Sequence, residues 1–141
     1  MTEYAAPFST LTYAGARAAL DAAVAQAASL GVAVNVSVCD QAGHEVAFAR
    51  MDGAALLSAD IARDKAYTVA AFLGIPTERW HDMIKDAPAL REGIVHRDRL
   101  VIFGGGVPVT VDGVAVGAVG VSGGTEAQDV EIANAGAAAV C

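Results

Sequence analysis

The chain is poor in the residues that commonly cross-link a small protein or give it a strong positive charge. It has only two cysteines, Cys39 and Cys141, and no Cys-x-x-Cys pair, so we expect no disulfide framework. The nine Lys and Arg residues form no cluster and the net charge is −7, which argues against a nucleic-acid partner. No segment reaches the roughly 18 consecutive apolar residues that a membrane-spanning helix needs. The sequence therefore predicts neither a nucleic-acid-binding nor a membrane protein.

Histidine is scarce as well. The three histidines are His44, His81 and His96, and no two of them have the His-x-x-x-His spacing of a helical metal site. A closed structural zinc site is therefore not expected. A haem iron needs only one or two protein ligands, so a single histidine can still serve there. His96 is the best placed, because it lies in an irregular connection beside a glycine-rich bend.

What the chain does have is an excess of small apolar residues. Hydrophobic residues make up 55% of the 141 residues, and much of the excess is Ala and Val. This length fits one domain spanning residues 1–141. Small apolar side chains make flat surfaces that suit burial between subunits, so we expect a homo-oligomer. The first four residues lack the basic region and apolar core of a signal peptide, which favours a cytoplasmic protein.

The periodicity of apolar residues predicts helices and strands in separate groups. Thr12 can cap the first helix and Gly31 can end it, while Asp112-Gly113 is typical of a two-residue hairpin turn. The predicted helices span residues 12–30, 54–73, 77–86 and 125–140, and the predicted strands span 32–39, 44–51, 100–103, 107–111 and 114–121. Residues 87–99 are expected to be irregular. Because hairpins join the strands, we predict an α+β fold with an antiparallel sheet covered by helices.

A glycine-rich stretch at residues 116–124 leads into the last helix. Thr125 and Gln128 have the spacing of a capping box. Backbone N–H groups exposed at such a junction can bind an anion. Alternatively, the glycines let helix and sheet backbones approach closely. The pattern alone leaves both interpretations open.

Lys65 is the most informative cation, because it shares a helical stripe with Ile61 and Phe72. A partly buried ammonium group needs an anion, either from a carboxylate-bearing ligand or from Asp64, Asp60 or a neighbouring subunit. We predict that Lys65 and the two glycine bends converge on one hollow that accepts anionic ligands. The predicted ligand-binding residues are Arg50, Lys65, Gly105, Gly106, Gly123, Gly124 and Thr125.

Taken together, several segments resemble the GlcG/HbpS-like haem-binding family, which also includes the C-terminal domain of PduO-type proteins. The matching segments are Val38-Cys39-Asp40-Gln41-Ala42-Gly43-His44, Arg50-Met51-Asp52-Gly53-Ala54, Ser58, Ala62-Arg63-Asp64-Lys65-Ala66, Phe103-Gly104-Gly105-Gly106-Val107-Pro108, Asp112-Gly113, 117–124 and Gln128-Asp129. The resemblance covers roughly residues 10–138. It implies a profilin-like fold with a five-stranded antiparallel sheet, oligomers from dimers to octamers, and haem binding that in some members leads to haem degradation.

The resemblance gives the candidate residues a physical role. Haem is a large apolar plate with two propionates, and Lys65, Arg50 and the helix start after Gly124 are expected to meet these carboxylates. His96 or His44 is the expected iron ligand. The alternative is a metal-free isomerase, lyase or hydrolase acting on an anionic metabolite, in which His96 or an Asp moves a proton. A non-catalytic assembly or sensor module is a third hypothesis, without a specific motif to support it.

Overall fold

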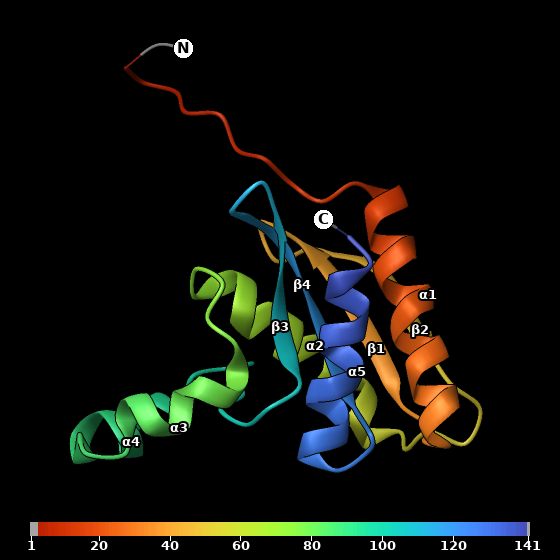
Figure 1. Cartoon of the computed structure of the whole chain (residues 1–141). Coiled ribbons are helices and arrows are strands. Elements are labelled where there is room, and N and C mark those ends of the chain that lie inside the picture. The colour runs from red at the N-terminus through yellow and green to blue at the C-terminus, as the bar shows by residue number, and fades with distance from the viewer. Residues whose placement is uncertain (1–2, 141) are drawn as a thin grey trace.

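The computed structural model describes residues 3–140 of the chain. In chain order the elements are α1 (Tyr13–Leu30), β1 (Asn35–Asp40), β2 (Glu45–Arg50), α2 (Leu57–Ala71), the 3-10 helix η1 (Thr77–Arg79), α3 (Trp80–Ile84), α4 (Pro88–Ile94), β3 (Gly106–Val111), β4 (Val114–Ser122) and α5 (Glu126–Ala138). The short helices α3 and α4 extend from one side of the main body (Figure 1). The predicted α+β class is confirmed.

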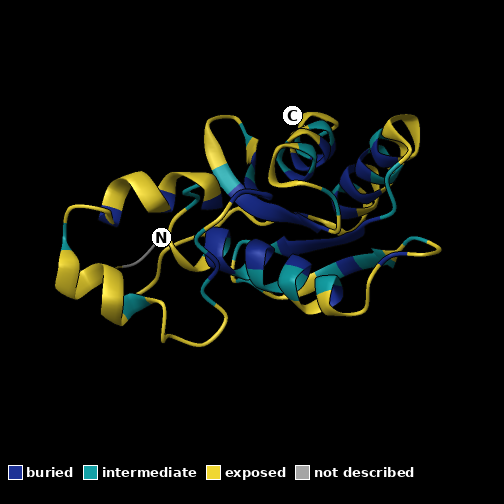
Figure 2. Cartoon of the chain, turned by 90° about the horizontal axis from the view of Figure 1, so that it is seen from below, coloured by how far each residue is buried: buried dark blue, intermediate teal, exposed yellow. Residues whose placement is uncertain are grey.

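One antiparallel sheet of four strands, in the order β2-β1-β4-β3, organises the described residues. Helices α1 and α5 cover one face of the sheet and α2 covers the other, as Figure 2 shows from below. The expected fifth strand at residues 100–103 is wrong. Within this segment Val101 donates to the Thr68 hydroxyl instead of to a neighbouring strand, and Gly104, directly after it, donates to Glu126. Val101 is buried, whereas Phe103 is exposed, so the apolar pattern of this segment does not correspond to sheet pairing.

Local signals placed most element ends correctly. The Thr12 hydroxyl accepts a hydrogen bond from the Gly15 N–H, and Gly31 ends α1 in the left-handed conformation that glycine tolerates. The predicted capping box is confirmed, because the Thr125 and Gln128 side chains each accept from the backbone N–H of the other residue. These ends depend on bonds within a few residues, which explains why the sequence predicts them well.

The segment after α2 departs from the sequence prediction. The helix predicted at 77–86 is the short pair η1 and α3, and the stretch predicted as irregular contains α4. Pro88 stands in the first turn of α4, where its missing N–H costs no helical hydrogen bond. None of the α4 residues is buried, and the helix is only seven residues long, so its apolar residues give periodicity little to detect.

Helix α2 lies unusually close to the sheet. A Cβ atom on Gly120 would collide with the Ala62 carbonyl oxygen, and one on Gly106 would lie 2.7 Å from the Lys65 carbonyl oxygen. Both contacts are with the backbone of α2, which cannot move without shifting the helix. The glycines of β3 and β4 therefore act here as points of close approach between helix and sheet.

Candidate functional site

Lys65 belongs to α2, and its side chain lies inside the molecule near β4 and the start of α5. Its side chain is only 1% exposed, and its ammonium group donates to the Val121 carbonyl oxygen at 2.8 Å and to Asp129 at 3.1 Å. The partners expected from sequence, Asp64 and Asp60, are therefore wrong for this chain. The ion-pair interpretation itself is supported, with an acceptor from the first turn of α5 that lies far away in the sequence.

Both glycine bends do meet at Lys65. A Cβ on Gly105 would lie 2.6 Å from the ammonium nitrogen. On the other side, Asp129 accepts a hydrogen bond from the Gly124 N–H at 2.9 Å with its second carboxylate oxygen. The predicted convergence is thus present, but Asp129 already supplies the anion. We call Lys65, Asp129, Gly105, Gly124 and the Val121 carbonyl the lysine hub.

The charge of the hub is balanced within the chain. Burial lowers the pKa of Lys65, and the nearby carboxylates of Asp129 and Glu126 oppose this effect. Glu126 in turn accepts a hydrogen bond from the Gly104 N–H. The interior groups that were expected to receive an anionic ligand are therefore engaged with side chains of α5.

The other predicted residues are spread over the surface. Thr125 caps α5, and Gly123 lies beside it with φ +136°. Arg50 is exposed at the end of β2. His44 lies just before the start of β2, with 82% of its side chain exposed and its ring 3.7 Å from the Asp40 carboxylate. Because the length of β2 separates Arg50 from His44, these two cannot serve one site within a single chain. Whether any of them contacts a ligand stays a prediction.

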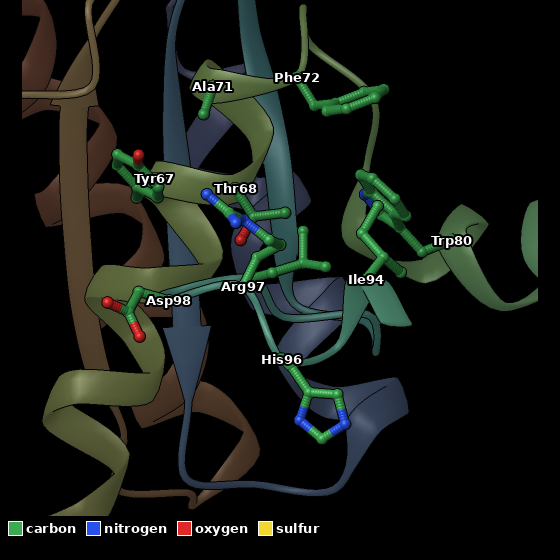
Figure 3. A pocket seen from close by; sticks show the side chains of 10 residues that line it. Tyr67, Thr68, Ala71, Phe72, Trp80, Ile94, His96, Arg97 and Asp98 are labelled. Carbon is green, nitrogen blue, oxygen red and sulfur yellow. The ribbon is translucent and has the colours of Figure 1, made fainter. Parts of the chain in front are cut away.

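A pocket of about 430 Å³ lies on a different side of α2. Helix α2 forms one wall, Trp80 and Ile94 form the opposite wall, and the connection from His96 to Leu100 closes the third side (Figure 3). The lining residues are Tyr67, Thr68, Ala71, Phe72, Trp80, Ile94, His96, Arg97, Asp98 and Leu100. We call this the α2–α3 pocket. Its volume falls within the range of small-molecule sites.

Thr68 fixes the connection that closes the pocket. Its hydroxyl accepts from the Val101 N–H at 3.0 Å and lies 2.9 Å from the Arg99 carbonyl oxygen. Arg99 adds a hydrogen bond to Asp64 at 2.9 Å and stacks on the Tyr67 ring with its guanidinium 4.0 Å from the ring centre. Arg99 also has φ +67°, which is uncommon for a residue with a side chain. Helix α2 thereby positions residues 96–101 over the pocket.

The pocket combines aromatic rings with cationic and imidazole side chains. Phe72 and Trp80 meet edge to face, with ring centres 4.7 Å apart. Arg97 extends beside Thr68, while His96 lies at the lower end of the pocket in Figure 3. Arg97 forms no side-chain ion pair with any residue between 3 and 140. The site therefore suits a flat, partly apolar ligand that carries negative charge.

Sequence reasoning identified only part of this pocket. It selected His96 but gave no role in the site to Trp80, Arg97 or Thr68. The sequence signal that could have pointed to the pocket is the adjacent pair His96-Arg97 in the connection after Trp80. This pair lines the pocket only because α4 brings the connection back against α2, and periodicity did not predict α4.

The residues that the structure describes limit which metals this site could hold and whether the chain could cross a membrane. Between residues 3 and 140, no group of three or more His, Cys, Asp or Glu side chains is arranged to hold a metal ion. A metal held mainly by a porphyrin, with one protein ligand, does not need such a group. Across the same residues, no helix is both long and apolar enough to cross a membrane.

Comparison with curated proteins gives clear relatives. A 15.0 kDa protein of Citrobacter freundii, described as uncharacterized, is 41% identical over 121 residues, which cover 85% of this chain and 84% of the relative. Protein GlcG of Escherichia coli K12 is 40% identical over 89 residues, or 63% of each chain. Corrinoid adenosyltransferase PduO of Salmonella typhimurium is 38% identical over 120 residues, which are 84% of this chain but only 35% of PduO.

The three-dimensional comparison agrees with the sequence comparison. The structure described as a PduOC:heme complex has a TM-score of 0.83 and 34% identity, and the match covers 92% of this chain and 94% of that one. The family described as haem degrading protein HbpS-like matches residues 11–138. Together with the GlcG and PduO relatives, these matches confirm the resemblance found in the sequence. The chain belongs to the HbpS-like family.

Proposed function

We propose that this protein binds haem in the α2–α3 pocket. The observation that carries the proposal is that one hollow is lined by three aromatic residues and by Arg97, which has no ion-pair partner among residues 3–140, with the His96 imidazole at its lower end. Support also comes from the family description and from the similarity to a protein solved as a heme complex. The charge of the lysine hub is balanced internally, and the pocket of about 470 Å³ beside it is lined by the acidic side chains of Glu78, Asp82 and Glu126, which disfavour an anionic ligand.

The pocket residues fit the chemistry of the group. Phe72 and Tyr67 provide surface for the apolar plate, and the buried Trp80 packs against Phe72. Arg97 provides a charged, multiple hydrogen-bond donor for a propionate. His96 would be the protein ligand to the iron, because it is the histidine that lines the pocket. When bound, haem would supply an iron centre able to bind and exchange further ligands.

The remaining predictions about function become proposals of the same kind. We propose that the protein handles haem in the cytoplasm, by binding and release or by degradation, and that its fold is of the profilin-like type. A free, buried Cys39 and helices on both faces of an antiparallel sheet are consistent with these proposals. Exposed Leu56, Leu57 and Leu73 on the surface favour assembly into a homo-oligomer of two to eight copies.

A haemin titration followed by visible absorption tests the proposal. We expect a sharp Soret band that reaches an end point at one haem per pocket. His96→Ala should alter the band and weaken binding, whereas the matched control His81→Ala, in the neighbouring helix α3, should leave both unchanged. A His44→Ala variant tests the other predicted ligand. A spectrum identical to that of free haemin would overturn the proposal and favour the metal-free enzyme.

A further inference from the structure

Trp80 carries a hydrogen-bond donor that the protein does not use. Its side chain is 1% exposed, and its indole nitrogen has no hydrogen-bond partner within the described part of the chain. The indole N–H can only donate, and a buried tryptophan usually finds an acceptor for it. A group outside the described chain, such as a ligand, could supply the missing acceptor for this nitrogen.

The neighbouring groups in the pocket cannot satisfy this donor. Phe72 meets Trp80 edge to face and carries no nitrogen or oxygen that could accept a hydrogen bond. The Thr68 hydroxyl is already engaged with the backbone of Arg99 and Val101. Figure 3 shows the indole of Trp80 across the pocket from Arg97. The indole nitrogen is closed off from solvent, so a ligand lying between these two side chains reaches it only when a covering side chain moves.

The polar groups that border this space are mostly donors. Arg97 brings a guanidinium group with several N–H donors and no acceptor. Asp98 and Tyr67, which also line the pocket, lie together on its opposite side from Trp80 (Figure 3). A ligand placed between Trp80 and Arg97 therefore meets two donor side chains, one of them cationic. The chemical group that matches both is a carboxylate.

We infer that Trp80 and Arg97 together bind one carboxylate of the ligand, so that the pocket selects planar molecules bearing a free carboxylate. The Trp80 N–H donates one hydrogen bond and Arg97 supplies further donors and the positive charge. This inference builds on the proposed function, since a haem propionate is such a group. It goes further in assigning recognition to Trp80 and in predicting that esters of the same plate bind poorly.

Metal-free protoporphyrin IX and its dimethyl ester test this inference without any contribution from an iron ligand. Porphyrin fluorescence measures the affinity of each. The wild-type protein should bind the diacid at least about tenfold more tightly than the ester, because a hydrogen-bonded ion pair is lost on esterification. Since Trp80 is the only tryptophan in the chain, its fluorescence should also be quenched to a one-to-one end point.

Trp80→Phe keeps an aromatic ring but removes the N–H group together with the second ring of the indole, and the ester serves as the control for the lost packing. We expect about tenfold weaker binding of the diacid and little change for the ester. Circular dichroism and thermal unfolding check that the variant is folded. Arg97→Gln, at an exposed position, is a second variant that should also reduce the preference for the diacid over the ester. Arg97→Lys keeps the positive charge and should retain part of that preference. Arg79→Gln, an exposed arginine outside this pocket, is the matched control.

The outcomes separate the inference from the proposed function. If haemin gives its Soret band but the wild type binds diacid and ester equally, carboxylate recognition by Trp80 and Arg97 is wrong while haem binding stands. Equal losses for diacid and ester in Trp80→Phe would likewise overturn it, because they would show a packing role. If neither porphyrin nor haemin binds, both proposals fail.

Discussion

The lysine hub and the α2–α3 pocket lie on different sides of the same helix and differ in how their polar groups are satisfied. In the hub, Lys65 is bonded to Asp129 and to the Val121 carbonyl. In the pocket, Trp80 keeps an unused donor and Arg97 has no ion-pair partner among residues 3–140. A region whose charges are balanced internally holds the fold together. A region with surplus donors beside a hollow is suited to receive a ligand.

The largest expected effect comes from breaking the hub pair. Asp129→Ala leaves the Lys65 ammonium buried without its counter-charge, so we expect a loss of about 3–5 kcal/mol in the free energy of unfolding. Urea denaturation followed by circular dichroism measures it. Asp60→Ala, which removes an exposed carboxylate on α2, should change stability by less than about 0.5 kcal/mol.

A double variant separates charge from packing at the hub. Lys65→Met combined with Asp129→Leu replaces the pair by apolar side chains and should recover much of the stability lost in Asp129→Ala. If the double variant is as unstable as the single one, the pair stabilises the fold mainly through its hydrogen bonds to the Val121 carbonyl and the Gly124 N–H, and not by balancing a buried charge. Both variants should leave haemin binding in the pocket intact when measured below their unfolding transitions.

Gly105 offers a sharper test of the tight packing in the hub. Gly105 has φ +126°, and an added Cβ would lie 2.6 Å from both the Lys65 ammonium and the Val121 carbonyl oxygen. Gly105→Ala should therefore cost about 2–4 kcal/mol, from backbone strain and from displacement of the ion pair. Gly53→Ala, at φ +85° with nothing within 4 Å, is the matched control and should cost only about 1 kcal/mol. Equal losses would mean that backbone conformation alone matters.

Thr68→Val tests how the pocket wall is held. The substitution keeps the shape of the side chain but removes the acceptor for the Val101 N–H, leaving that buried donor unsatisfied. We expect a loss of about 1–2 kcal/mol in stability and weaker haemin binding, because residues 96–101 lose their attachment to α2. Thr110→Val, at an exposed position of β3, should change neither quantity. Unchanged haemin affinity in Thr68→Val would show that Arg99 alone positions the connection.

The same contrast explains what the sequence could and could not predict. Thr12, Gly31 and the Thr125–Gln128 capping box define helix ends through bonds within a few residues, and these ends were predicted closely. The convergence of Lys65 with the glycine bends was also predicted, because each element carried a clear pattern. The partner Asp129 was missed, since choosing it requires knowing that the start of α5 comes next to Lys65 at the end of β4, although α5 and α2 cover opposite faces of the sheet.

The pocket was harder to predict for a related reason. Helix α4 is short and has no buried residue, so the sequence gives only a weak periodic signal for it. Residues 100–103 carry strand-like side chains, yet the Val101 N–H bonds to Thr68 and the next N–H along the chain, that of Gly104, bonds to Glu126. Long-range hydrogen bonds from side chains to the backbone decide this region, and a single sequence does not reveal them.

The smallest predicted effect is a dependence of stability on alkaline pH that originates in the hub. Burial lowers the pKa of Lys65 in the folded state below its unfolded value of about 10.4. Between these two values the unfolded chain binds more protons, so the contribution of Lys65 to the free energy of unfolding rises with pH. The slope stays below the roughly 1.4 kcal/mol per pH unit of a fully linked proton, because Asp129 and Glu126 oppose the shift.

Measuring the wild type against the Lys65→Met, Asp129→Leu variant isolates this contribution. The tyrosines and Cys39, whose pKa burial raises to about 12, are common to both proteins and cancel in the difference. The difference in free energy of unfolding should change in favour of the wild type as the pH increases toward 10. A change in the opposite direction would mean that Asp129 stabilises the charged lysine more than burial disfavours it. In that case the attraction between Lys65 and Asp129 would outweigh the desolvation of Lys65. The hub would then differ from the pocket in having paired charges, and not in being more deeply buried.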